Sequence, residues 1–192
     1  MIIGITGNSG SGKTEISKIL SERINAEIID ADKIVKKISV PENEYYKKQI
    51  ELFGTEILID NKLNTKKIAE IIYNNSEIRE KLNKLTYKYV VDEIKKEIKK
   101  YKNKNIVIDA PLLFESGLNK NCDITVGVIA KKEIKLERII KRDKIRENTA
   151  ESRLSIQKED DFYIKNADFI LVNNGNIKEI NLEEICTKIG KN

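Results

Sequence analysis

The 192-residue chain is predicted to fold as an α/β protein around a five-stranded parallel sheet with helices on both faces. Short apolar runs rich in β-branched residues recur along the chain, and helical patterns separate most of them, which is typical of a buried parallel sheet. A glycine-rich loop follows the first run, and a long middle stretch shows helical spacing only. The predicted strands are residues 2–6, 26–30, 105–109, 124–129 and 169–172.

The helical segments indicate how the domain is organised. Residues 13–24 carry an apolar face of a helix, and a last helix is expected over about residues 177–189. The stretch from about 34 to 103 has no convincing strand and ends in a long helical pattern, which predicts a helical insertion. We expect one domain with three parts: a core (1–33, 104–137 and 160–192), a substrate-binding insertion (about 34–103) and a lid (about 138–159).

Composition excludes several classes of chemistry. The chain has no histidine, so histidine-based triads are excluded, and its two cysteines form no metal-ligand pattern. With 40% hydrophobic and 35% charged residues, the sequence is that of a soluble protein. No apolar run approaches the roughly 18–20 residues of a membrane span, and the first apolar run is too short for a signal peptide, so we expect a cytoplasmic location without a membrane partner.

The segment Gly7–Thr14 matches the phosphate-binding pattern G-x-x-x-x-G-K-[ST] and has a strand before it and a helix after it. Glycines let consecutive N–H groups turn inward around an anion, and the helix N-terminus adds its positive dipole end. Lys13 is expected to reach the β- and γ-phosphates of a nucleotide, and Thr14 to offer its hydroxyl to Mg²⁺. The motif predicts nucleoside triphosphate binding without separating kinases, GTPases and ATPases. The candidate ATP-binding residues in it are Asn8, Ser9, Gly10, Ser11, Gly12, Lys13 and Thr14.

Carboxylates follow two of the predicted strands, at the sheet edge where ligands of such folds bind. Asp32 comes just after the second strand and can accept the proton of a hydroxyl nucleophile, although it could also only cap the next helix. Asp109 ends the third strand, where P-loop proteins carry a carboxylate that meets Mg²⁺ directly or through water. We favour catalysis for Asp32 and metal binding for Asp109.

Three arginines follow the fourth strand at a spacing of four residues, namely Arg138, Arg142 and Arg146. If one helix spans them, their guanidinium groups share a face, as in the lid of small-molecule kinases. The planar guanidinium binds phosphate oxygens in pairs, which favours function for Arg142. For Arg146 we favour an ordinary exposed helix position. These features together predict a P-loop kinase with an arginine-bearing lid.

The sequence resembles the dephospho-CoA kinase family over nearly its whole length. Beyond the phosphate-binding loop, the matching segments are Ile29–Lys33, Phe53-Gly54, Leu63-Asn64, Asp109–Glu115, Arg138, Arg142-Asp143, Arg153 with Gln157, Ala167-Asp168 and Asn173–Gly175. The resemblance implies that ATP phosphorylates the ribose 3′-hydroxyl of dephospho-CoA, the last step of coenzyme A synthesis.

The resemblance also implies roles for individual residues. It places Asp32 at the acceptor hydroxyl, Arg142 at the transferring phosphate and Asn173 near the adenine of ATP. Arg138 is expected to contact ATP, and Leu112 and Tyr87 the acceptor. The family usually has His-Pro where this chain has Tyr87-Lys88, and Arg where it has Thr65, so the departures concern the acceptor contacts.

Two alternative functions remain open at the level of sequence. Another small-molecule P-loop kinase, such as a nucleoside or nucleotide kinase, would share the motif and the lid. A nucleotide-regulated RNA-binding protein would use the net charge of +5, but no RNA-reading aromatic motif accompanies it. We therefore expect ATP and dephospho-CoA as partners, Mg²⁺ as cofactor and no nucleic acid.

Overall fold

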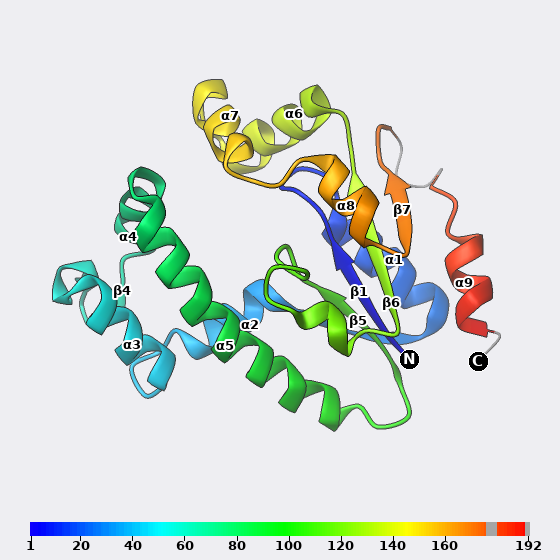
Figure 1. The fold of residues 1–192 in the computed structure, drawn as a ribbon, viewed down its shortest axis with the longest axis horizontal. Helices are drawn as coiled ribbons and strands as arrows, with labels where there is room; N and C mark the ends of the chain where they lie inside the picture. Colours follow the sequence, from blue (N-terminus) through cyan, green and yellow to red (C-terminus); the bar gives the residue numbers. More distant parts are fainter. Residues whose placement is uncertain (176–179, 191–192) are drawn as a thin grey trace. The chain divides into compact units, whose positions relative to one another are not determined.

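A five-stranded parallel sheet forms the centre of the first of two units in the computed structural model, which describes residues 1–175 and 180–190 (Figure 1). This sheet unit comprises Met1–Asp30 and Tyr101–Asn192. The strand order is β2-β5-β1-β6-β7, and every pairing is parallel. The strands are β1 (Ile2–Thr6), β2 (Ala26–Asp30), β5 (Asn105–Asp109), β6 (Ile124–Ile129) and β7 (Phe169–Val172), which confirms the five predicted strands.

Helices cover both faces of this sheet. Helix α1 (Lys13–Ile24) packs on β1, β2 and β5 together with α9 (Glu183–Gly190), whereas α8 (Asp160–Asn166) lies in front of β6 and β7 (Figure 1). The core between them is aliphatic and includes Ile3, Ile5, Ile16, Leu20, Val126 and Val128. Helices α6 (Lys132–Asp143) and α7 (Glu147–Ser155) pack on each other through a smaller cluster of Leu136, Ile139 and Ala150.

Side-chain hydrogen bonds fix the last strand on its neighbour. Asp168, just before β7, accepts hydrogen bonds from the N–H and the hydroxyl of Thr125 on β6, at 2.8 and 2.7 Å. These bonds lower the pKa of the Asp168 carboxyl, with the Thr125 hydroxyl as the largest cause. They set the register in which Val126 faces Phe169, and so they position the segment that follows β7.

The second unit, Ala31–Lys100, is mainly helical. It contains α2 (Ala31–Ile38), α3 (Glu44–Phe53), α4 (Thr65–Asn74) and the 25-residue helix α5 (Ser76–Lys100), which confirms the predicted long helix. A 3₁₀ turn (Thr55–Ile57) leads into a small hairpin of β3 (Leu58–Ile59) and β4 (Lys62–Leu63). The expectation of no strand here was therefore wrong. Asp60 and Asn61 adopt positive φ angles of 49° and 59°, which a two-residue hairpin turn requires.

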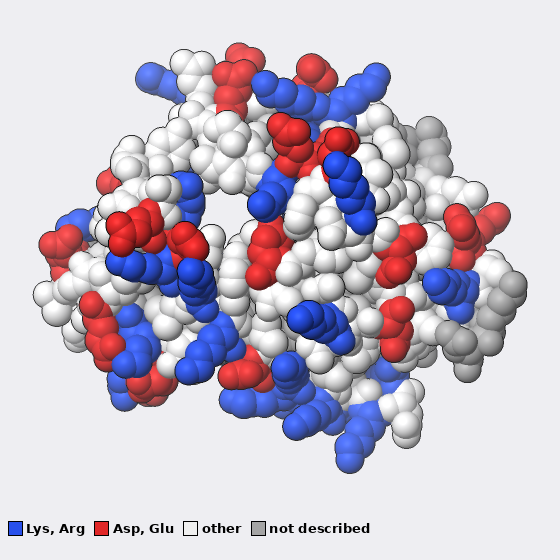
Figure 2. All heavy atoms as spheres, in the orientation of Figure 1, with Lys and Arg blue, Asp and Glu red and all other residues white. Residues whose placement is uncertain are grey.

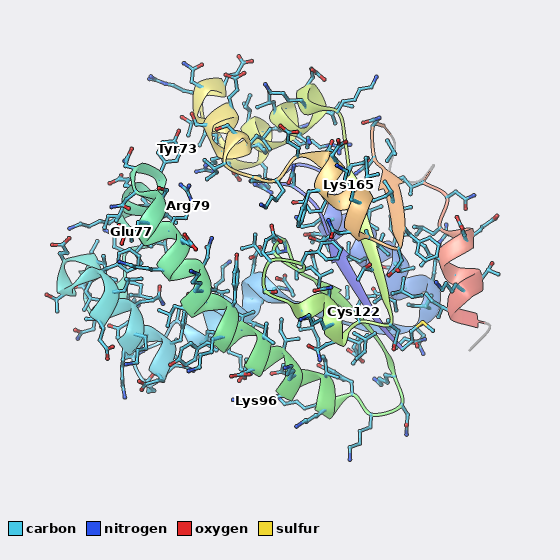
Figure 3. All side chains as sticks on the ribbon, viewed as in Figure 1. Tyr73, Glu77, Arg79, Lys96, Cys122 and Lys165 are labelled. Carbon is cyan, nitrogen blue, oxygen red and sulfur yellow. The ribbon has the colours of Figure 1, made fainter. Side chains whose placement is uncertain are left out.

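Charged groups on the helical unit are extensively paired. Lys37 on α2 contacts Glu93 and Glu97 on α5 at 2.9 and 2.6 Å, and these hydrogen bonds, Glu97 first, raise the pKa of the lysine. Lys96, labelled on α5 in Figure 3, pairs with the same Glu93. Figure 2 shows acidic and basic side chains interspersed on the face in view. Lys96 and Lys100 near the end of α5 thus belong to mixed charge networks.

The C-terminal part differs from the prediction at one boundary. Helix α9 begins at Glu183, whereas the helix was expected from about residue 177. Residues 177–179 of that expected helix lie outside the described residues. Among the helices described over residues 1–175 and 180–190, none has the length and apolar character needed to cross a membrane.

Candidate active site

The glycine-rich loop lies between the carboxyl end of β1 and the N-terminus of α1. Gly10 and Gly12 have φ angles of 78° and 94°, in the left-handed region that residues other than glycine rarely adopt. Such left-handed residues within a loop turn successive backbone N–H groups toward one point. Lys13, half-buried, is the first residue of α1, so its charge adds to the positive end of the helix dipole. The loop has the geometry of a phosphate site.

Oxygen atoms suited to a hard cation meet beside this loop. The hydroxyl of Thr14 donates a hydrogen bond of 2.8 Å to Oδ2 of Asp109, a residue with 6% exposure at the end of β5. Asp30 is the register partner of Asp109 on β2, which brings a second carboxylate-bearing residue to the same edge. Mg²⁺ prefers oxygen ligands and commonly takes only one or two carboxylates plus phosphate oxygens. The donor set of Thr14 and Asp109 therefore fits Mg²⁺.

Arg138 and Asn173 hold the back of the loop. The guanidinium of Arg138 donates to the carbonyls of Gly10 (3.2 Å), Ser11 (3.4 Å) and Asn173 (3.1 Å) and to Oδ1 of Asn173 (3.2 Å). Nδ2 of Asn173 donates to the Ser11 carbonyl at 2.7 Å, and Asn173 is only 2% exposed. Both side chains, predicted to contact ATP, are thus engaged with the carbonyls of the phosphate-binding loop.

Arg142 meets the outer end of the loop. Its Nη2 donates to the hydroxyl of Ser9 at 3.1 Å, and its Nε donates to Asp143 at 2.7 Å. Arg153 on α7 contacts the other oxygen of Asp143 at 2.8 Å. The hydrogen bond from Arg142 is the largest cause of the lowered pKa of the Asp143 carboxyl, and the nearby Arg153 adds to it. Asp143 therefore orients both arginines next to the loop.

The same end of the loop is held by three residues outside the glycine-rich motif, namely Gln157, Lys158 and Tyr163. Nδ2 of Asn8 donates to the Lys158 carbonyl (2.8 Å), and its Oδ1 accepts from the hydroxyl of Tyr163 (2.7 Å). The N–H of Ser9 donates to Oε1 of Gln157 at 2.9 Å. Burial raises the pKa of the Tyr163 phenol, so it remains a donor at neutral pH. Gln157 was visible in the family pattern, whereas no sequence signal indicated Tyr163 or the Lys158 carbonyl.

The predicted acceptor residues are distributed over both units. Asp32 is exposed in the first turn of α2, and Tyr87 lies on α5, both in the helical unit. Leu112 is 40% exposed in the segment after β5 of the sheet unit. Arg146 precedes α7, because α6 has already ended at Asp143. The structure therefore brings the nucleotide-side candidates together within one unit, and the acceptor contacts stay a prediction.

This sheet order, with a phosphate-binding loop after β1 and a carboxylate at the end of β5, gives the chain the fold of the P-loop kinases. A solved structure from Thermus thermophilus has the same fold with a TM-score of 0.81, at 24% identity and with coverage of 100% of this chain and 96% of that one. A shikimate kinase from Acinetobacter baumannii, at 19% identity and a TM-score of 0.54, shares the fold over 99% of this chain and 90% of its own.

More specific similarity comes from sequence comparison. Residues 1–179 match the family model described as dephospho-CoA kinase. A dephospho-CoA kinase from Fusobacterium nucleatum is 40% identical over 98% of both chains, and one from Bacillus cereus is 34% identical over 92% of this chain and 90% of its own. The structure of the enzyme from Campylobacter jejuni has a TM-score of 0.63 at 26% identity and covers 99% of this chain and 95% of that one.

The chain belongs to the dephospho-CoA kinase family. It is accordingly a phosphotransferase with an alcohol group as acceptor, and it uses ATP and dephospho-CoA in coenzyme A biosynthesis. The alternative of a nucleoside or nucleotide kinase is not favoured by these matches.

Proposed function

We propose that this chain transfers the γ-phosphoryl group of ATP to the ribose 3′-hydroxyl of dephospho-CoA, and that the residues around the phosphate-binding loop carry the transfer. Family membership supports the reaction. The observation that carries the assignment of the site is the convergence of Thr14, Asp109 and Arg142 on one glycine-rich loop. Phosphoryl transfer depends mainly on alignment and charge neutralisation, and this arrangement provides both.

On the nucleotide side, we assign the phosphates to the backbone N–H groups of residues 8–14 and to the ammonium group of Lys13. Arg142 supplies further positive charge to the transferring phosphate, because its contact with Ser9 holds it at the loop. Arg138 and Asn173 act on ATP chiefly by fixing the carbonyl side of the loop, so that its N–H groups keep their direction. A direct contact of Asn173 with adenine, as the resemblance implies, remains a prediction.

Thr14 and Asp109 are the residues that would hold Mg²⁺, because their oxygens are 2.8 Å apart beside the loop. The ion would neutralise charge on the β- and γ-phosphate oxygens. Asp109 ends a strand and Thr14 lies in the first turn of α1, so neither ligand depends on a mobile loop. Asp30, the register neighbour of Asp109, keeps this edge of the sheet negative.

On the acceptor side, we assign proton removal from the 3′-hydroxyl to Asp32, and contacts with dephospho-CoA to Leu112 and Tyr87. Asp32 follows Asp30 by two residues in the chain, and the absence of histidine leaves a carboxylate as the natural proton acceptor. The helical unit would hold the acceptor, and residues 138–159 would act as the lid. A cytoplasmic location remains the expectation from sequence.

A coupled ADP-release assay with and without dephospho-CoA tests the proposal. We expect ADP release to require dephospho-CoA, and ³¹P NMR of the product to show a phosphate on the ribose 3′ position. A panel of nucleosides and nucleotides should give little turnover. Lys13→Ala provides the inactive control, since it removes charge at the β- and γ-phosphates without touching the core. Dephospho-CoA-independent ADP release, or a preference for a nucleoside acceptor, would refute the proposal.

A further inference from the structure

The side chain of Gln157 accepts the N–H of Ser9, and other contacts already attach the segment around Gln157 to the phosphate-binding loop. Gln157 Oε1 accepts this N–H at 2.9 Å. One residue away, the side chain of Asn8, only 5% exposed, is fixed at both ends by the Lys158 carbonyl and the Tyr163 hydroxyl. The segment after α7 would thus remain attached to the loop without the hydrogen bond of Gln157. Attachment of this segment therefore does not require Gln157 to contact Ser9.

Ser9 also receives the lid arginine. Nη2 of Arg142 donates to its hydroxyl at 3.1 Å, so the backbone N–H and the side chain of Ser9 both meet residues from 138–159. Under the function proposed above, Arg142 acts on the transferring phosphate. A donor that lies on the same residue as this arginine contact is positioned for the γ-phosphate rather than for the α-phosphate.

We propose that the N–H of Ser9 binds the γ-phosphate of ATP and that Gln157 occupies this N–H until ATP arrives, so that Gln157 competes with the transferred phosphate for one donor. A phosphate oxygen is a stronger acceptor than a neutral amide oxygen, so ATP displaces the amide. Gln157 lines a hollow of about 540 Å³ together with Ser155 and Lys158, which gives the displaced side chain space. This inference rests on the proposed function, because it assigns the γ-phosphate to the loop end beside Arg142.

The discriminating experiment compares ATP with ADP, which lacks the γ-phosphate. Gln157→Glu keeps an acceptor for the Ser9 N–H but adds a negative charge where the γ-phosphate would bind. We expect isothermal titration calorimetry with Mg²⁺ to show that ATP affinity falls about tenfold more than ADP affinity, as one partly screened like charge implies. Ile156→Glu is the matched control, since it adds the same charge one residue away on a side chain that is 49% exposed. It should leave the ratio of the two affinities unchanged.

A second variant guards against misfolding of the first. Gln157→Ala removes the competing acceptor, so ATP affinity should rise about two- to tenfold, the range set by one net hydrogen bond, while ADP affinity stays constant. If Gln157→Glu does not fold, this ratio decides alone. Equal changes in ATP and ADP affinity would overturn the inference, because a purely structural brace affects both nucleotides alike. Turnover of the wild type with dephospho-CoA, measured on the same preparation, tests the proposed function separately.

Discussion

Gly12 and Asn173 are expected to be energetically coupled, because a side chain at position 12 would occupy the place of the Asn173 amide. A Cβ atom at Gly12 would lie 2.2 Å from Nδ2 of Asn173, and the φ angle of Gly12 is 94°. Alanine in this conformation costs roughly 1–2 kcal/mol. Displacing the amide breaks its 2.7 Å hydrogen bond to the Ser11 carbonyl, which costs about 1–3 kcal/mol in a buried place. Gly12→Ala should therefore destabilise the fold by about 2–5 kcal/mol.

A double-mutant cycle tests this reasoning. Asn173→Ala alone loses the same hydrogen bond to the Ser11 carbonyl. The double variant loses this bond only once, so its destabilisation should be smaller than the sum of the two single variants by about 1–3 kcal/mol. Urea unfolding followed by far-UV circular dichroism is suitable because the chain has no Trp. Gly117→Ala is the control: its φ is 72°, but no heavy atom of the described residues other than its chain neighbours lies within 4 Å of the added Cβ, so only backbone strain of roughly 1–2 kcal/mol is expected. Strict additivity of Gly12→Ala and Asn173→Ala would refute the steric argument.

Three further outcomes are expected. Asp32→Asn should slow single-turnover transfer to dephospho-CoA by ~10²–10⁴-fold while ATP affinity stays near normal. Asp32 lies within the first turn of α2 rather than at its N-cap, and a loss under about threefold would exclude Asp32 as the base. Arg142→Ala should lower kcat more than it raises KM in steady-state kinetics, whereas a rise in KM alone would make it a ground-state binding residue. Burial raises the pKa of Glu115, whose Oε2 has no hydrogen-bond partner among the described residues. The folded state therefore disfavours the ionised carboxylate, and the free energy of unfolding falls as pH rises through the folded-state pKa. Glu115→Gln should accordingly raise Tm at pH 7 and have little effect below about pH 4, and an equal gain at both pH values would contradict this.

The sheet could be predicted from sequence because its signals are local. Each strand is a short, largely apolar run, and every strand except β6 ends at or just before Gly, Asp or Asn. Strands such as β5 have buried side chains throughout their centre. The phosphate-binding loop is equally local, since its φ angles require glycine at fixed positions. The β3–β4 hairpin escaped prediction because it has only two residues per strand, too few for an alternating pattern.

The three arginines spaced four residues apart, Arg138, Arg142 and Arg146, show where periodicity stops being informative. A spacing of four residues predicts a shared face only while the helix continues, but α6 ends at Asp143, and Lys144 takes a φ of 53° in the left-handed region. Arg146 therefore does not share a helix face with Arg138 and Arg142. Periodicity also gives no information on what faces a side chain. The family resemblance predicted that Arg138 contacts ATP, and the tertiary fold directs its donors to the loop carbonyls.

The variable positions of the phosphate-binding motif connect the loop to the rest of the sheet unit. Phosphate chemistry constrains the glycines, the lysine and the hydroxyl of G-x-x-x-x-G-K-[ST], because these supply backbone direction, charge and a metal ligand. It leaves the side chains at positions 8 and 9 unconstrained. In this chain Asn8 binds the Lys158 carbonyl before α8 and Tyr163 within it. The hydroxyl of Ser9 meets Arg142 from α6, and its N–H meets Gln157 in the segment after α7. These contacts use the side chains of Asn8 and Ser9 and, at Gln157, the backbone N–H of Ser9. Any shift of the loop on nucleotide binding would reach that segment through Asn8 and Ser9, and it would reach Arg138 through the carbonyls of Gly10 and Ser11.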